Sequence, residues 1–76
     1  MNERTIVALP LYWDAIYEIA LALKASRPQQ TLEEVTLGNI FSWTVALPNF
    51  ADDPSLANDE ILAAIYQEWF EEINPL

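Results

Sequence analysis

The chain of 76 residues contains no cysteine and no histidine. Without cysteine it has no disulfide, no thiolate ligand for a metal or a cluster, and no persulfide chemistry. Without histidine it lacks the commonest general base at neutral pH and the commonest transition-metal ligand. Carboxylates and carbonyls are the metal ligands that remain, and they favour hard cations. We therefore expect that the chain is not an enzyme and holds no cofactor tightly.

Basic residues are scarce as well, because three bases stand against twelve acids and the net charge is −9. A field of this sign repels nucleic-acid phosphates and anionic lipid headgroups, and it attracts a basic protein surface. Solubility alone is another explanation for such a charge. We expect a protein partner with a basic surface, and neither nucleic acid nor membrane as a partner.

The chain also has no long apolar run. The apolar stretch over residues 5–13 is too short to span a bilayer, and it lacks a signal-peptide pattern. With 53% hydrophobic residues the chain is nevertheless rich enough in apolar side chains to fold. We expect one soluble, cytoplasmic domain over residues 1–76, monomeric without its partner, with a loose end at Met1 to Arg4.

Apolar residues at helical spacing predict helices in the first two thirds of the chain. The first helix covers about residues 13–25 and ends before Pro28. The motif Thr31-Leu32-Glu33-Glu34 is typical of a capping box and predicts a short helical turn. The next helix is predicted at about residues 39–47, where apolar residues occupy nearly every side. A domain this small can hardly bury them all, and Trp43 is the candidate partner contact among them.

The last helix carries the clearest signals. Asn58 is the predicted N-cap, and the two acids after it suit the first turn of a helix. An irregular loop between Pro48 and Pro54 comes before it. The apolar stripe of the last helix faces the first helix and comprises Ile61, Leu62, Ile65, Tyr66, Trp69, Phe70 and Ile73. The core predicted between the two helices contains Ile19, Leu23, Ile61, Leu62, Ile65 and Trp69.

Two groups of acids are candidate binding residues. The first group lies within nine residues and consists of Asp52, Asp53, Asp59 and Glu60. A weak site for a hard cation is one interpretation, although the segment fails the EF-hand pattern, because Pro54 and Leu56 stand where oxygen ligands belong. The other interpretation assigns Asp53 to the cap of the turn at Pro54, and the two acids after Asn58 to the helix dipole.

The second group lies in the last turns of the last helix and consists of Glu68, Glu71 and Glu72. The helix dipole disfavours an anion at this end by roughly 0.3–1 kcal/mol. Stability alone would therefore place Lys or Arg there. One interpretation is a frayed, solvated helix end, and the other is an acidic edge that binds a partner.

A further set of residues keeps a particular order and spacing along the chain. It consists of Trp13, Glu18, Ile19, Leu23, Trp43, the loop Phe50-Ala51-Asp52-Asp53-Pro54, and Asn58 followed by Ile61-Leu62-Ala63-Ala64-Ile65 and Trp69. Together these residues resemble the IscX family, small acidic proteins associated with the iron–sulfur cluster operon of bacteria. The resemblance covers residues 13–72 and leaves residues 1–12 outside it as an extension.

The resemblance implies a mainly α fold, a small compact helical domain similar to a modified winged helix. It also implies binding to the cysteine desulfurase that supplies sulfur, a role as its regulator, and weak binding of ferrous iron through surface carboxylates. The family usually has acids where Asn39, the run 46–49 and Ala51 stand in this chain. The carboxylates left for iron are Asp52, Asp53, Asp59 and Glu60, together with the C-terminal glutamates.

Three hypotheses follow from these observations. The first is an acidic accessory factor of iron–sulfur cluster assembly that binds a cysteine desulfurase. The alternative is a small helical protein–protein interaction subunit unrelated to iron. The third is a winged-helix binder of nucleic acid, which rests on fold alone and which the net charge opposes.

Overall fold

The computed structural model describes residues 9–74, and the loose end predicted at Met1 to Arg4 lies outside them. The helices are α1 (Ile16–Ser26), α2 (Leu37–Val45) and α3 (Asp59–Ile73), with two short 3-10 helices, η1 (Leu32–Glu34) and η2 (Pro54–Leu56). The mainly α fold class is therefore confirmed. Residues 9–74 form no strand, and their β structure is an isolated parallel bridge between Leu11 and Phe50. The winged-helix detail of the prediction is not confirmed.

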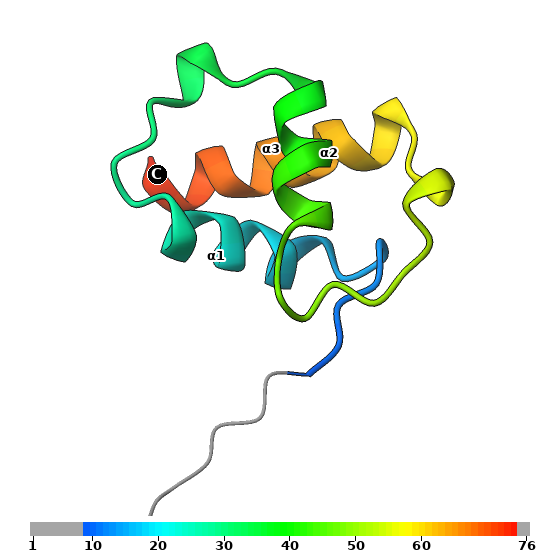
Figure 1. Cartoon of the computed structure of the whole chain (residues 1–76). Helices are drawn as coiled ribbons and strands as arrows, with labels where there is room; N and C mark the ends of the chain where they lie inside the picture. The colour runs from blue at the N-terminus through cyan, green and yellow to red at the C-terminus, as the bar shows by residue number, and fades with distance from the viewer. Residues whose placement is uncertain (1–8, 75–76) are drawn as a thin grey trace, which may run out of the picture.

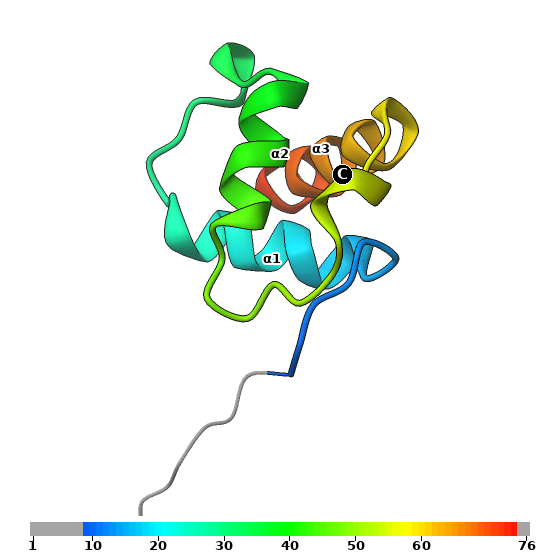
Figure 2. The same ribbon diagram turned by 45° about the vertical axis from the view of Figure 1, so that its right-hand side comes forward.

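Two of the helices form a pair. α1 and α3 lie side by side and run in the same direction, and α2 crosses them (Figure 1). The turned view shows the same arrangement (Figure 2). We refer to the two ends of this pair as its N-terminal end and its C-terminal end. No helix formed by residues 9–74 has the length and the apolar character that crossing a membrane requires.

α1 begins at Ile16, three residues later than predicted. Trp13 lies in the turn before α1 and is only 3% exposed, so its side chain is buried although the residue is not part of the helix. Its main-chain N–H donates to Asp52 Oδ2 at 2.9 Å, and its indole N–H donates to the Asp53 carbonyl oxygen at 2.9 Å. Apolar spacing extended the predicted helix to Trp13, but these distant contacts hold the residue in a turn.

The capping box predicted at Thr31 is wrong, because the Thr31 side chain makes no cap hydrogen bond. The box belongs to α2. Thr36 Oγ1 accepts from the Asn39 N–H at 3.1 Å, and Asn39 Oδ1 accepts from the Thr36 N–H at 3.0 Å. Two of the otherwise unsatisfied donors at this helix start are thereby paired, so α2 begins at Leu37, two residues earlier than predicted.

α3 begins as predicted, because Asn58 Oδ1 accepts from the Ile61 N–H at 2.8 Å. The buried apolar residues are Leu11, Trp13, Ile19, Ala20, Leu23, Leu32, Ile40, Leu62, Ile65 and Trp69. The predicted core between α1 and α3 is confirmed, with Ile61 packed half-buried at its edge. Phe70 and Ile73 are exposed, so the apolar stripe of α3 is narrower than predicted.

Candidate functional site

Hydrogen bonds hold the loop before α3 against the segment before α1. The Leu11 N–H donates to the Asn49 carbonyl oxygen and the Ala51 N–H donates to the Leu11 carbonyl oxygen, each at 2.8 Å. The two hydrogen bonds of Trp13 complete the connection. We call this arrangement the clasp, and it consists of residues 11–13 and 49–53.

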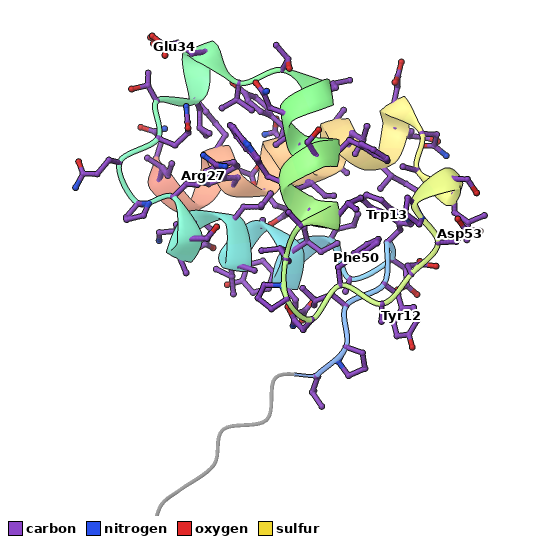
Figure 3. The ribbon with its side chains drawn as sticks, in the orientation of Figure 1. Tyr12, Trp13, Arg27, Glu34, Phe50 and Asp53 are labelled. Carbon is purple, nitrogen blue, oxygen red and sulfur yellow. The ribbon has the colours of Figure 1, made fainter. Side chains whose placement is uncertain are left out.

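Aromatic rings fill the clasp. The Phe50 ring meets the Trp13 ring edge-on, with 4.9 Å between their centroids. The Phe41 ring from α2 stacks on Trp13 at 6.1 Å. Figure 3 shows Tyr12, Trp13, Phe50 and Asp53 gathered at one side of the molecule, away from Arg27. Pairs of this kind add roughly 0.5–1.5 kcal/mol beyond the area that they bury, so the loop is firmly attached to the helices.

Asp52 and Asp53 are part of the clasp. Asp52 Oδ2 accepts from the Trp13 N–H, and its Oδ1 accepts from the Asp53 N–H at 2.7 Å. Asp53 Oδ1 accepts from both the N–H and the hydroxyl of Ser55, each at 2.9 Å. These hydrogen bonds from Ser55 lower the pKa of Asp53 below 3.8. The interpretation of Asp53 as the cap of the turn at Pro54 is confirmed.

The four carboxylates predicted to bind iron occupy two places. Asp52 and Asp53 lie in the clasp, whereas Asp59 and Glu60 lie exposed in the first turn of α3. Within residues 9–74, no three side chains of the metal-ligating types are grouped so that they could hold a metal ion. An iron site on these carboxylates would have to form as iron binds, and weak affinity for ferrous iron stays a prediction.

An open groove of about 750 Å³ lies beside the clasp at the N-terminal end of the helix pair. Its apolar lining includes Tyr12, Ile16, Leu56, Ile61 and Ala64. Its acidic lining consists of Asp14, Asp52 and Glu60. The groove thus combines apolar side chains with carboxylates, which suits the docking of a chain that carries both apolar and basic residues.

Sequence reasoning missed this groove. Tyr12 lies outside residues 13–72, to which the resemblance extends, and Leu56 was considered only as a residue that cannot bind calcium. The groove brings Asp52 and Glu60 of the first acidic group to one surface, and it adds Asp14. A local signal was available, because Leu56 is a large apolar residue between Ser55 and the polar start of the last helix.

The second acidic group lies at the C-terminal end of the helix pair. The Glu72 carboxylate is 3.7 Å from Lys24 Nζ in a partly exposed ion pair, and Glu71 accepts from the Gln67 side-chain amide at 2.9 Å. Exposed pairs of this kind contribute little to stability, about 0–1 kcal/mol. Glu68 is half-buried on the same helix. A role of these three glutamates in partner binding stays a prediction.

Tyr17 lies near this second group and is partly exposed. The charge of Glu72 is the main cause that raises its phenol pKa above 10.0. Partial burial, a hydrogen bond to Glu72 and the charges of Glu68 and Glu18 add to the effect.

Trp43, the predicted aromatic partner contact, is half-buried on α2. It meets Trp69 edge-on at 6.3 Å, and the Arg27 guanidinium lies 3.7 Å from the centre of its ring. A base of the same chain therefore covers part of the face that a partner would need. A role of Trp43 in partner binding stays a prediction.

Basic residues are gathered at one end of the described structure. Of the three bases, Arg4 lies outside the described residues, while Lys24 and Arg27 lie at the C-terminal end of α1. Both of these bases have partners there, in the carboxylate of Glu72 and the ring of Trp43. In the part of the chain between residues 9 and 74, the N-terminal end of the helix pair therefore carries acids and no base.

Comparison with known proteins gives a family and a relative. A family model described as iron-sulphur cluster assembly matches residues 11–74. An uncharacterised protein of Pseudomonas aeruginosa is 36% identical over 64 residues, which is 84% of this chain and 97% of that protein. The family match includes Leu11 and Tyr12, so it also covers the first segment of the clasp and the aromatic wall of the groove.

Proposed function

The chain belongs to the IscX family of iron–sulphur cluster assembly proteins, and on that premise we propose that it is an accessory protein that binds a cysteine desulfurase. Its involvement in iron–sulphur cluster assembly follows from the family. The proposal adds the partner and the mode of action. The chain regulates the enzyme by docking on it in the cytoplasm, and it performs no catalytic step itself.

The observation that carries the proposal is the placement of charge. Acids outnumber bases four to one, and both bases of the described residues have partners within the chain. The surface left for a partner is therefore anionic. Opposite potentials steer two proteins together and speed their association, so an anionic surface favours a basic partner over an acidic one.

The family supports a binding role over an enzymatic one. The titratable side chains that line the groove are three carboxylates and Tyr12, and Asp52 is already engaged by two main-chain N–H groups. The groove is open, whereas catalysis by carboxylates needs a site that excludes water and holds a substrate in register. Weak ferrous-iron binding is a secondary part of the proposal, and it is tested below.

The test is a calorimetric titration of the full chain with the cysteine desulfurase from the same cells. It is run at about 0.05 M and about 0.3 M salt, because exposed charges are screened beyond roughly 8 Å at physiological ionic strength. We expect binding that weakens steeply as the salt rises. The rate of sulfide release by the enzyme, measured with and without the chain, then gives the sign of the regulation.

Failure of the desulfurase to bind at low salt would overturn the proposal. The alternative of an interaction subunit unrelated to iron then gains support, and a pull-down from the source cells separates the two. The first proposal expects the desulfurase among the captured proteins, whereas the alternative expects another assembly without it.

A further inference from the structure

We infer that the groove at the N-terminal end of the helix pair is the surface that receives the desulfurase. Its occupant is a segment of that enzyme in which a large apolar side chain stands beside Lys or Arg. This inference rests on the proposed function and deepens it, because it assigns the contact to one face and gives the chemistry of the segment that fits.

The first reason is the uncovered apolar surface. Tyr12 is 47% exposed and Leu56 is 59% exposed, and both line the groove beside the half-buried Ile16 and Ile61. Large apolar side chains gather at the centres of protein interfaces, where a few of them carry most of the binding free energy. The groove therefore has room and apolar walls for one anchoring side chain of a partner.

The second reason is charge. Asp14 and Glu60 are exposed and Asp52 is half-buried, and all three line the groove. Lys24 follows Ile16 by eight residues on α1, which places it about 12 Å farther along the helix at 1.5 Å per residue. This separation exceeds the distance of roughly 8 Å beyond which salt at physiological ionic strength screens exposed charges from each other. The described bases therefore leave the groove acids uncompensated, and a basic segment is favoured there.

The C-terminal end of the helix pair offers a weaker match to such a segment. Lys24 already neutralises Glu72, and Arg27 covers the ring of Trp43. A basic partner approaching this end would meet two bases of the same sign. The distribution of charge within the described chain thus distinguishes two acidic ends that appear alike in the sequence.

The third reason is that one wall of the groove is already fixed. The clasp holds Asp52 against Trp13, and Asp53 fixes the turn that presents Leu56. A binding surface that is ordered before the encounter loses less conformational entropy on association. The partner segment therefore meets a formed surface rather than a loop that has to fold around it.

The test compares two matched pairs of variants. Leu56→Ala and Glu60→Gln change the groove, whereas Ile73→Ala and Glu71→Gln make similar changes at exposed positions of the C-terminal end. Glu60 and Glu71 both lie on α3, and each glutamine variant removes one negative charge, so the two variants alter the net charge equally. All four side chains are exposed, and thermal unfolding by circular dichroism verifies that each variant is folded.

We expect Leu56→Ala to weaken binding of the desulfurase about tenfold, because it removes an apolar wall that contacts the anchoring side chain of the partner. Glu60→Gln should weaken it about threefold at low salt and reduce its salt dependence. The two control variants should stay within about twofold of the parent. Amide shifts of the labelled parent chain on addition of the desulfurase should centre on residues 12–16 and 56–64.

The outcomes separate this inference from the function on which it rests. A parent chain that does not bind the desulfurase overturns both. Binding by the parent with losses and amide shifts confined to residues 68–73 overturns the groove alone and supports the acidic edge predicted from the sequence. Equal losses in all four variants also overturn the groove, because they show that net charge acts without a specific surface.

Discussion

The packing of α1 against α3 is tested most directly by truncating Ile65. This side chain is fully buried, at 0% exposure, between the two helices. Ile61 lies one turn earlier on the same helix and is only half-buried. Ile65→Ala and Ile61→Ala are therefore chemically identical changes that differ in burial. Both replace isoleucine by alanine within α3, where the propensity difference is below about 0.7 kcal/mol, so a larger difference between them reports the core contact.

The expected sizes follow from burial. Removing a fully buried isoleucine side chain costs about 2–5 kcal/mol, because the lost apolar contact and the cavity left behind both count. At the half-buried Ile61 the cost should be about 1–2 kcal/mol. A domain of this size has a total stability of about 4–11 kcal/mol. At about 4–8 °C per kcal/mol, Ile65→Ala should lower the melting temperature by about 8–40 °C.

The assay is urea unfolding followed by far-UV circular dichroism, with linear extrapolation to water. If Ile65→Ala leaves too little folded protein to measure, Ile65→Val provides a milder change of about 0.5–1.5 kcal/mol. Equal losses for Ile65→Ala and Ile61→Ala would refute the assigned phase of α3. A loss below about 0.5 kcal/mol at Ile65 would do so as well, because no buried isoleucine is that inexpensive to remove.

Three further predictions concern charge. The folded pKa of Asp53 lies below 3.8, so the stabilising effect of its carboxylate is present above pH 3.8 and is lost as the pH falls through the folded pKa. Asp53→Asn should therefore make unfolding less sensitive to acid. Unchanged acid sensitivity would contradict the role of the Ser55 hydrogen bonds. Glu72→Gln should move the pKa of Tyr17 down toward 10.0 in an NMR titration of its ring; an unmoved pKa would show that the glutamate charge is not the cause. Ferrous iron added to the labelled chain should broaden amide signals centred on residues 52–60; broadening confined to residues 68–72 would relocate the site, and none would remove it.

Sequence reasoning succeeded where the signals are local. Asn58 caps α3 as predicted, because the cap, the acids after it and the apolar spacing all act within a few residues. It failed at α2, since Asn39 closes the capping box there and the usual pattern expects Glu or Gln at that position. Thr31 matches the usual pattern but forms no such bond. The helix starts were therefore less predictable than the helices themselves.

The groove was beyond local reasoning. Its residues come from the turn before α1, the loop before α3 and the first turns of both helices. Trp13 joins these parts through contacts with residues about forty positions away, and no periodic pattern encodes such a pairing. The acids were found from the sequence, but which of them share a surface with Leu56 depends on the parallel course of α1 and α3.

The clasp has a consequence for the order in which the chain folds. Its hydrogen bonds from Trp13 span 39 and 40 residues, so closing it costs the entropy of a long loop, which the local contacts within a helix do not require. The helices are expected to form before this closure. A brief opening of the clasp would leave the helices folded but would remove the groove. The ability to dock would then be the last property gained in folding and the first lost in local unfolding. Hydrogen exchange at the amides of Trp13 and Ala51, compared with the amides inside α3, measures how often that happens.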